Sequence, residues 1–204
     1  MEKARRWAVE WEQRGGETLT ALEPTADELR RAAPELAASY NDSHNRVMMG
    51  HDGQPHTAAD VLAYYDELRT EGGRPFLLYV GGVLMGDADF RNIDIEEASG
   101  EFAIMIGERA SQGRGLGTRF ALMLHRFGYD VLGLERIFIS VIPANAASRR
   151  LFEKLGYQVD DSPEARKLID AETDLTMSLA RAAFDRTRGS DHAAVRVFQR
   201  PPLA

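Results

Sequence analysis

A chain of 204 residues with 44% hydrophobic and 28% charged side chains is long enough for one globular domain with a substantial core. A formal net charge of -7 argues against nucleic-acid binding, which usually needs a basic face, and the absence of cysteine excludes disulfides, cysteine nucleophiles and thiolate metal sites. No stretch reaches the roughly 18 to 20 apolar residues of a membrane span, and the charged N-terminal segment lacks the apolar part of a secretion signal, so we expect a cytoplasmic protein.

The first segment of the chain is polar enough for a short surface helix over residues 2–13, and we treat residues 1–14 as an N-terminal helical extension. Trp7 and Trp11 lie one helical turn apart on it. Their shared apolar face either docks on the rest of the protein or contacts a second copy, which leaves a homodimer open.

A strand and two helices are expected next. Residues 17–22 alternate as a strand does, and Thr25 should cap a helix through Ala37, because its hydroxyl can accept from the N–H groups of the first turn. Asn, Asp, His and Gly dominate residues 41–55, which predicts a loop, and a second helix follows at residues 57–70.

The rest of the chain alternates between strands and helices, with a Gly81-Gly82 turn suited to a hairpin. The predicted elements are strands at residues 76–80, 83–90, 101–106, 136–142 and 173–180, and helices at residues 120–131 and 145–155. This order predicts a mixed α/β fold, one domain over residues 1–185, rather than a doubly wound sheet. Residues 186–204 are polar and irregular, so we expect a disordered tail there.

The most informative segment is the sequence Q-G-R-G-L-G at residues 112–117, between an apolar strand and an amphipathic helix. Its glycines allow a tight turn and a close approach of ligand to backbone, and the free N–H groups of the following helix favour an anion. Residues 101–150 carry seven Arg against four acidic residues, whereas residues 51–100 carry three Arg against ten. The basic segment suits a polyanionic cofactor and the acidic segment a cationic substrate, unless the acidic charges form a solvated face.

Two nucleotide-binding motifs fit this turn less well. A dinucleotide fold places G-x-G-x-x-G after the first strand of a βαβ unit, but here the turn comes late, after a hairpin, and reads Q-x-x-G-x-G. A Walker loop has Lys before its Ser or Thr, whereas Gly117 precedes Thr118. Nucleotide binding is therefore the third alternative.

Two motifs together resemble the GCN5-related N-acetyltransferases (GNAT superfamily). The turn at residues 112–117 looks like the pyrophosphate-binding signature of that superfamily, and N-A-A-S-R-R-L-F-E-K-L-G-Y at residues 145–157 looks like its second helix motif. The resemblance covers about residues 75–180 and is greatest to the branch of ribosomal-protein N-terminal and spermidine acetyltransferases. It implies a central mixed, mostly antiparallel sheet with splayed central strands, flanked by helices.

The resemblance also implies acetyl-CoA as co-substrate. The backbone of residues 101–106 and 136–142 would bond the pantetheine arm like an added strand. The implied cofactor residues are Ile104, Met105 and Ile106 at the pantetheine, Gln112, Gly113, Arg114, Gly115, Leu116, Gly117 and Thr118 at the pyrophosphate, and Asn145 on the other side of the arm. Arg149 and Lys154 are candidates for the adenosine phosphate, with a solvated helix face as the alternative.

Acyl transfer to an amine needs a neutral nucleophile, a stabilised oxyanion and a proton for the departing thiolate. Glu101 is the predicted general base, because it begins the cofactor strand and burial beside Phe102 would raise its pKa; the alternative is an exposed carboxylate. A backbone N–H near Met105 or Ile106 is the expected oxyanion donor. Some relatives carry the base at the position of Ser140, where serine cannot act alone.

Phe152 departs from the family pattern. Many members have Tyr at this position, whose hydroxyl protonates the thiolate, and phenylalanine has no proton to give. Tyr129 and Tyr157 are candidate substitutes, each with a core role as the alternative. The departure also leaves open a catalytically silent module that binds acyl-CoA or a partner.

The acidic segment supplies the expected acceptor side. Asp87 and Asp89 alternate and therefore share one face of a strand, and with Asp94, Glu96 and Glu97 they would surround a cationic acceptor. Small-molecule amines such as polyamines or aminoglycosides, and peptide N-termini, fit this charge; an acidic hairpin tip in solvent is the alternative.

We therefore predict an acyl-CoA-dependent N-acyltransferase, transferring acetyl to a primary amine, with no nucleic-acid or membrane partner. His51, Asp52 and His56 are metal-ligand types, but their spacing fits no standard site, so no metal is expected.

Overall fold

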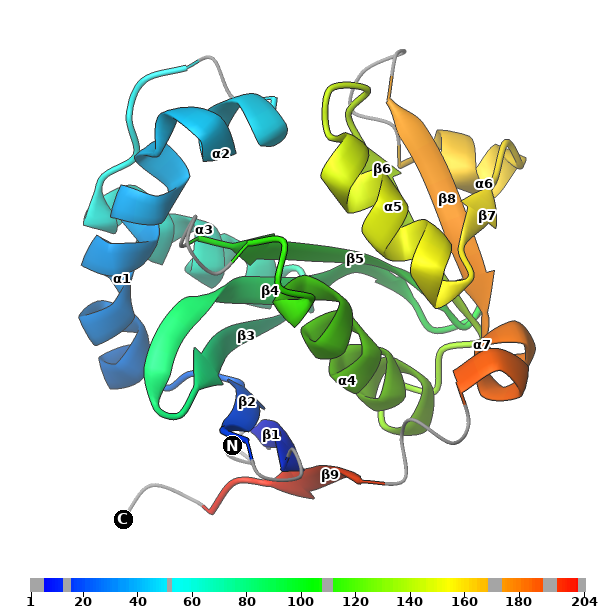
Figure 1. Ribbon diagram of the computed structural model, residues 1–204, viewed down its shortest axis with the longest axis horizontal. Helices are drawn as coiled ribbons and strands as arrows, with labels where there is room; N and C mark the ends of the chain where they lie inside the picture. Colours follow the sequence, from blue (N-terminus) through cyan, green and yellow to red (C-terminus); the bar gives the residue numbers. More distant parts are fainter. Residues whose placement is uncertain are drawn as a thin grey trace.

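The computed structural model describes residues 6–12, 16–50, 53–107, 112–168, 174–188 and 194–201. These residues form a nine-stranded sheet with helices on both faces, and the strand order is β7-β8-β6-β5-β4-β3-β2-β1-β9 (Figure 1). The strands are β1 (Trp7–Glu12), β2 (Thr18–Leu22), β3 (Arg74–Val80), β4 (Val83–Asp94), β5 (Ser99–Ile106), β6 (Arg136–Val141), β7 (Gln158–Val159), β8 (Leu175–Ala180) and β9 (Val195–Gln199). The helices are α1 (Ala26–Asn41), α2 (Ser43–Met48), α3 (Ala58–Thr70), α4 (Leu116–Asp130), α5 (Ala146–Leu155), α6 (Pro163–Arg166) and α7 (Arg181–Arg188).

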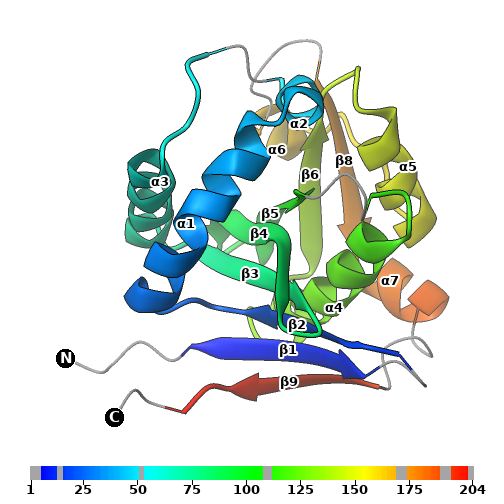
Figure 2. The same ribbon diagram turned by 60° about the vertical axis from the view of Figure 1, so that its left-hand side comes forward.

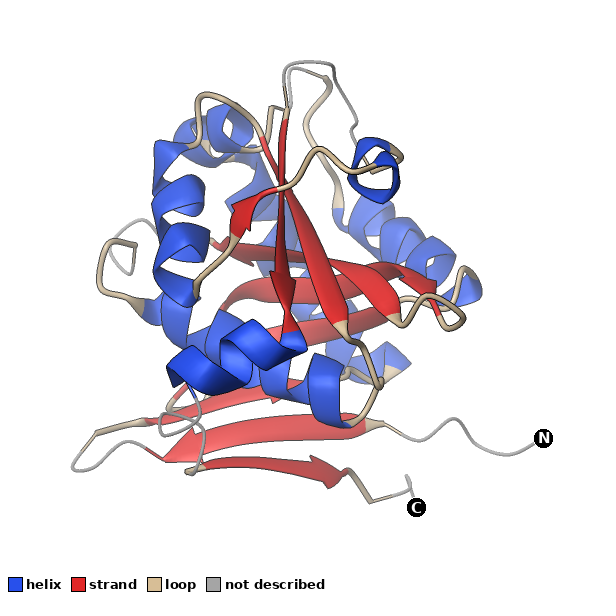
Figure 3. Cartoon of the chain, turned by 90° about the vertical axis from the view of Figure 1, so that its right-hand side faces the viewer, coloured by secondary structure: helices blue, strands red, loops and turns tan. Residues whose placement is uncertain are grey.

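Every pair of neighbouring strands is antiparallel except β5 and β6, which run parallel. The predicted mixed, mostly antiparallel sheet is therefore confirmed. The sheet is strongly twisted, so β6 and β8 cross β1 and β9 at a steep angle (Figures 2 and 3).

Two hydrophobic layers cover the faces of the sheet. Alternation along β3 divides them, because Phe76 and Leu78 face one layer and Leu77 faces the other. The larger layer, under α4 and α5, includes Phe90, Phe102, Phe120, Phe127, Phe152 and Leu155. The smaller layer, under α1 and α3, includes Leu29, Leu36, Val61 and Tyr65.

The caps of α1 and α3 explain where these helices begin. Thr25 accepts from the backbone N–H of Glu28, whose carboxylate accepts from Thr25 N–H in return, and Thr57 with Asp60 repeats the arrangement. Each such box satisfies two N–H groups that lack helical partners. The predicted N-cap at Thr25 is confirmed.

The predicted N-terminal helix is wrong in the described residues, because residues 7–12 form β1. A spacing of four residues places two side chains on one face of a helix and also on one face of a strand, so Trp7 and Trp11 did not distinguish the two. In the structure both tryptophans pack against the larger core layer, and Trp7 meets the ring of Phe127 at 6.1 Å between centroids. Their apolar face thus docks on the protein itself.

The predicted disordered tail is also wrong where the structure describes it, since α7 and β9 occupy part of residues 186–204. In β9, Val195 is buried and Val197 packs on the core, while Arg196 between them pairs with Glu10 of β1. β9 is antiparallel to β1, and the two described ends of the chain lie side by side (Figure 2). This alternation is short, and its partner strand lies far away in sequence. In the described part of the chain, no helix is long and apolar enough to cross a membrane.

Candidate active site

The parallel strands β5 and β6 pair over a short length and then diverge. Residues 99–101 of β5 lie opposite residues 136–138 of β6. Beyond them, β5 stays paired with β4 on one side, and β6 with β8 on the other. The edge of β5 at residues 102–106 that faces β6 has no paired strand among the described residues, so its main-chain groups can bond a ligand. This is the splay that the sequence predicted.

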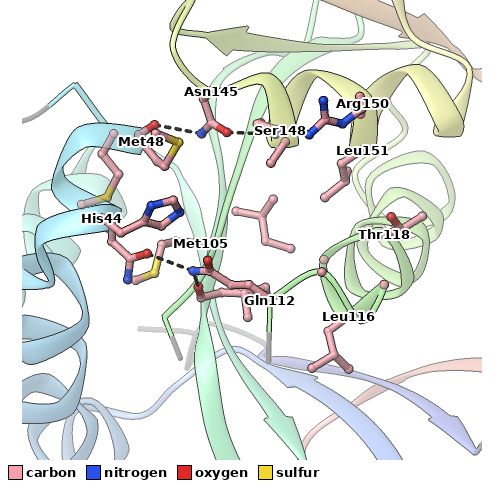
Figure 4. Close-up of a pocket in the computed structure, with 18 of the residues that line it drawn as sticks. His44, Met48, Met105, Gln112, Leu116, Thr118, Asn145, Ser148, Arg150 and Leu151 are labelled. Carbon is pink, nitrogen blue, oxygen red and sulfur yellow. Dashed lines mark hydrogen bonds between the residues drawn. The ribbon is translucent and has the colours of Figure 1, made fainter. Parts of the chain in front are cut away.

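A cavity of about 350 Å³ lies in the divergence, between β5, the glycine turn and α5 (Figure 4). Its lining contains all the predicted cofactor residues except Arg114 and Arg149: Ile104, Met105, Ile106, Gln112, Gly113, Gly115, Leu116, Gly117, Thr118 and Asn145. Arg114 is exposed and lies outside the lining. The structure thus brings together two segments that are about 30 residues apart in the sequence.

The glycine turn leaves the start of α4 directed at this cavity. Gly115 is the N-cap residue with a left-handed φ of 78°, and no side chain caps the helix. Leu116, Gly117 and Thr118 form the first turn and line the cavity. Uncapped N–H groups and the positive end of a 15-residue helix form an anion site, which fits a pyrophosphate.

Helix α2 holds the beginning of this turn in place. The Gln112 side-chain amide donates to the main-chain carbonyl of Ile106 (2.8 Å) and to the side-chain Oδ1 of Asn45 (2.9 Å). Asn45 is buried and in turn donates to the carbonyl of Gly107 at 2.9 Å. The last residues of β5, the turn and α2 are therefore one hydrogen-bonded unit (Figure 4).

The contribution of α2 was missed, because it lies in the segment predicted to be a loop. Its residues in the cavity lining are His44, Asn45, Met48 and Met49. The local signal was Asp42, whose side chain accepts from the N–H groups of His44 and Asn45 as an N-cap does. A six-residue helix gives little periodicity beyond such a cap.

Asn145 and α5 form the opposite wall. Asn145 caps α5 by accepting from Ser148 N–H at 2.9 Å, and its amide donates to the carbonyl of Met48 at 2.8 Å, which ties α5 to α2 (Figure 4). Asn145 itself lines the first cavity. The cations of this wall are Arg150 and Lys154.

Arg149, which the sequence offered as a candidate phosphate ligand, lies outside the lining. It pairs with Glu153 one turn later at 2.8 Å and is 54% exposed, which matches the alternative of a solvated helix face. One residue changes the direction of a helical side chain by 100°, so Arg150 rather than Arg149 turns toward the cavity. The pattern of a single helix did not decide between them.

A second cavity, of about 470 Å³, opens on the other side of the divergence. Both cavities are lined by Met48, Met49, Ile104, Met105, Asn145 and Ser148, so they meet where β5 and β6 separate. The second cavity also contains the predicted catalytic and acceptor residues Glu101, Asp87 and Asp89. An uncapped helix start with two cations therefore lies on one side of this junction, and buried carboxylates lie on the other.

Asp87 carries a buried negative charge beside this cavity. It is 7% exposed, and its Oδ2 accepts from the hydroxyls of Tyr40 and Tyr65. Burial raises the pKa of this carboxyl to about 6, against which the two tyrosine hydrogen bonds act. Its hydrogen-bond donors are neutral, so the carboxylate has a charge that a cation could balance.

Asp89 is equally buried but is paired with a cation. Arg91 donates to both of its oxygens, at 2.8 and 3.1 Å, and the hydroxyl of Tyr64 donates at 3.2 Å. Burial still raises the pKa of Asp89, while Arg91 opposes the rise. The alternative that Asp87 and Asp89 form a hairpin tip in solvent is excluded by their burial.

Glu101 lies on the same face of the sheet, because it is opposite Arg91 in the register of β4 and β5. It is 9% exposed, lines the second cavity and accepts from the side chain of Asn92 at 2.9 Å. The predicted burial of this carboxylate is therefore present. Its role as the base stays a prediction.

The other three carboxylates predicted on the acceptor side are not part of the cavity. Asp94, Glu96 and Glu97 are exposed at the turn between β4 and β5, where Asp94 accepts from the backbone N–H groups of the two glutamates. The prediction that these three surround the acceptor is wrong. β4 continues past the cavity, so its last carboxylate lies beyond the acceptor side.

Comparison with known proteins agrees with this geometry. The family model described as Acetyltransferase (GNAT) domain matches residues 23–158. The chain belongs to this GNAT family. The resemblance inferred from the two sequence motifs is thereby confirmed, and the match extends it into the N-terminal third of the chain.

Relatives of this GNAT chain include the human alpha/beta-tubulin-N-acetyltransferase 9, 33% identical over 76 residues, which are 37% of each chain. The spermidine N(1)-acetyltransferase of Escherichia coli (strain K12) is 27% identical over 121 residues, 58% of this chain and 64% of that protein. The chain thus matches less than two thirds of the length of these relatives.

Solved GNAT structures share the fold. Aminoglycoside acetyltransferase AAC(6')-Ib in complex with coenzyme A superposes with a TM-score of 0.68 at 21% identity, over 83% of this chain and 99% of that one. Spermidine N-acetyltransferase from Vibrio cholerae, in complex with coenzyme A and spermine, gives 0.64 at 18% identity, over 81% and 97%.

The two tyrosines suggested as substitutes for Phe152 of the GNAT helix motif form hydrogen bonds within the core. His125 Nδ1–H donates to the carbonyl of Ala121, which leaves Nε2 to accept from the hydroxyl of Tyr157. Tyr129 donates to the carbonyl of Leu179 at 2.9 Å. Both rings are buried and line neither cavity, so the core alternative is correct.

Two hydroxyls in the described part of the chain are buried without a hydrogen-bond partner, those of Ser140 and Thr176. They occupy opposite positions on β6 and β8. Ser140 lines the second cavity and Thr176 lines neither. A buried hydroxyl without a partner typically costs about 1–3 kcal/mol, so each position calls for an explanation.

No metal site accompanies these groups in the described residues, where no three His, Cys, Asp or Glu side chains are placed to hold an ion. His56 lines the second cavity and packs edge-on against Tyr40. His51 and Asp52 lie outside the described residues.

Proposed function

We propose that the protein is an acetyl-CoA-dependent N-acetyltransferase whose acceptor is a cationic primary amine. The observation that carries the proposal is the junction of the two cavities at the divergence of β5 and β6. An uncapped helix start and two cations lie on one side of it, and buried carboxylates lie on the other. An acyl donor and an amine could therefore meet end to end.

The residues of the first cavity fit coenzyme A. The start of α4 would hold the pyrophosphate, Arg150 and Lys154 would approach the adenosine phosphate, and the open edge of β5 would bond the pantetheine arm. The co-substrate supplies an activated acetyl thioester. A main-chain N–H near Met105 or Ile106 would stabilise the oxyanion formed from its carbonyl.

The second cavity supplies the chemistry of the acceptor. Asp87 would attract and orient an ammonium group, and Glu101 would accept the proton that the attacking nitrogen loses, directly or through water. The acetyltransferases of spermidine and aminoglycosides among the similar proteins act on amines of this charge. A peptide N-terminus is also within this class.

A turnover screen tests the proposal. Free thiol release from acetyl-CoA is measured with polyamines, aminoglycosides, amino acids and short peptides as acceptors. We expect the highest kcat/KM for a cationic acceptor, and a preference for neutral or acidic acceptors would contradict the charge argument. No thiol release with any of these acceptors would instead favour a module that only binds acyl-CoA.

Glu101→Gln examines the proposed base in the same assay. We expect kcat to fall about a hundredfold with coenzyme A affinity unchanged, because proton transfer typically contributes 10² to 10⁴. Glu97→Gln is the matched control, since Glu97 is an exposed glutamate outside the cavity. Equal rates for both variants would remove Glu101 from the mechanism.

A cytoplasmic location and a homodimer remain predictions from the sequence.

A further inference from the structure

The second cavity has one buried hydroxyl that is not engaged. The hydroxyls of Tyr40 and Tyr64 donate to Asp87 and Asp89. The Oγ of Ser140 has no hydrogen-bond partner among the described residues, although the side chain lines the same cavity. A group of this kind is suited to a ligand that enters the cavity.

Ser140 lies at the point where β5 and β6 separate. The last opposed pair is Glu101 with Phe138, so Ser140 is two residues further along β6 and level with Ala103 of β5. Opposed residues of parallel strands, and residues two apart on one strand, point to the same face of a sheet. Ser140 therefore shares the face of Glu101.

Phe152 faces the same cavity from α5. Its ring occupies the position where the family pattern places a hydroxyl, and the nearby hydroxyl of Tyr157 is bonded to His125. The second cavity therefore offers Ser140 as a buried hydroxyl level with Ala103, the residue before Ile104 of the junction.

We propose that Ser140 donates a hydrogen bond to the sulfur of coenzyme A as the acyl–sulfur bond breaks, and so replaces the hydroxyl that Phe152 lacks. The inference rests on the proposed acetyltransfer. The nitrogen lone pair forms the C–N bond, the C–S electron pair goes to sulfur, and the amine proton goes to Glu101 and from there to the thiolate or to water. Ser140 keeps its own proton, because an alcohol is a far weaker acid than a thiol, whose pKa is about 8.5 in cysteine.

Ser140→Ala tests this step. We expect kcat to fall about tenfold while the acceptor KM and the affinity for acetyl-CoA stay constant, because the hydrogen bond strengthens only as charge develops on sulfur. Thr176→Val is the matched control: it also removes a buried hydroxyl without a partner, at the opposed position on β8 and outside both cavities. Equal losses in the two variants would point to packing and overturn the proposal.

A rescue variant separates chemistry from structure. Phe152→Tyr returns a hydroxyl to the α5 position, so adding it to Ser140→Ala should restore most of the lost rate. Absence of rescue together with a tenfold loss in Ser148→Ala would transfer the role to Ser148, which lines both cavities. That result would contradict the assignment to Ser140.

Coenzyme A binding gives a readout that needs no acceptor. A hydrogen bond to the thiolate lowers the pKa of the bound thiol, so wild type should bind coenzyme A several-fold more tightly than Ser140→Ala at pH 9.5 and equally at pH 6. Acetyl-CoA, which has no ionisable thiol, should show no such pH-dependent difference. Parallel coenzyme A curves would overturn the proposal even if turnover is observed. If no acceptor is turned over, the acetyltransferase proposal fails while this measurement still decides the role of Ser140.

Discussion

Asp87 is the residue whose environment says most about the acceptor. Its carboxylate is buried against two tyrosine hydroxyls, whereas the neighbouring Asp89 is neutralised by Arg91. Desolvating a carboxylate is costly unless a cation balances it. In the proposed function, a bound ammonium group would provide that balance.

Asp87→Asn should therefore weaken binding of the acceptor without affecting binding of coenzyme A. We expect the acceptor KM to rise about tenfold, equivalent to about 1.4 kcal/mol, with coenzyme A affinity unchanged in calorimetry. Asp94→Asn is the control, because Asp94 is on the same strand but exposed beyond the cavity. A KM that is unchanged in Asp87→Asn would separate this carboxylate from acceptor binding.

The raised pKa of Asp87 also predicts how the acceptor KM of wild type and of Asp87→Asn depends on pH. As the pH falls through about 6, Asp87 takes up a proton, so the acceptor KM of wild type should rise and that of Asp87→Asn should not. Folding raises this pKa from 3.8, so the contribution of Asp87 to stability is largest below pH 4 and is lost as the pH rises through 6. In urea unfolding between pH 4 and pH 7, the unfolding free energy of Asp87→Asn should therefore lack the pH dependence that Asp87 gives to wild type.

The sequence predicted the chemical residues of the site better than their surroundings. Alternation alone placed Asp87 and Asp89 on one face of their strand, whereas the register of β4 and β5 brings Glu101 to the same face. Tyr40 and Tyr64 come from helices packed over that strand, so no local pattern linked them to the carboxylates. The predicted direction of the Arg149 side chain was wrong, because the solvated and the cavity-facing positions are adjacent on one helix.

At the scale of elements, the turn before α4 has a left-handed backbone that glycine adopts readily and other residues do not. A side chain at Gly115 would meet no atom within 4 Å, so only the left-handed backbone opposes one. An L-residue in that conformation costs about 1–2 kcal/mol.

Gly115→Ala should lower both the stability and the coenzyme A affinity. Gly133→Ala is the matched control, with φ of 71° and open space at its Cβ but no place in either cavity. We expect each variant to lose about 1 kcal/mol of unfolding free energy in urea. Only Gly115→Ala should bind coenzyme A more weakly. A normal affinity in that variant would argue against the turn as the pyrophosphate site.

The long helices were predictable and the short helix α2 was not. α1 and α3 have capping boxes and enough turns to show periodicity, whereas α2 has six residues inside a polar segment. Yet α2 connects the two walls of the first cavity, through Asn45 to the glycine turn and through Met48 to Asn145. Its value comes from tertiary hydrogen bonds that a sequence does not display.

At the scale of the molecule, Arg200 just after β9 joins the end of the sheet to the first helix. It donates to both carboxylate oxygens of Glu28 and to the carbonyl of Glu23. Glu28 is also the third residue of α1 and part of its capping box. The hydrogen bonds from Arg200 lower the pKa of Glu28 to about 2, although partial burial acts against them.

Arg200→Ala should reduce stability at neutral pH and flatten its acid dependence. The lowered pKa adds stability above about pH 4.5 that is lost as the pH falls through 2. Because the pair is partly exposed, we expect about 1 kcal/mol at pH 7 in urea unfolding and a smaller loss at pH 3. Arg196→Ala, which breaks an exposed pair on β9, should change stability little at either pH.

The central sheet was predictable because its strands follow one another in the chain, and the two outer strands were not. β1 pairs with β9, whose sequence is almost the full chain away, and neither strand is strongly apolar on both faces. Their pairing is decided by the buried Val9 and Val195 and by the tryptophans that cover the core. Such long-range complementarity gives no signal within a window of ten residues.

The pairing of β1 with β9 also determines when the molecule can finish folding. Glu10 and Arg196 are 186 positions apart, so during synthesis β1 leaves the ribosome long before its partner exists. Loop length adds slowly to the entropy of closure, so the penalty falls on rate more than on final stability. Until that last strand arrives, the nascent chain has an unpaired sheet edge that favours association with other chains, and chaperone dependence should be concentrated in this interval.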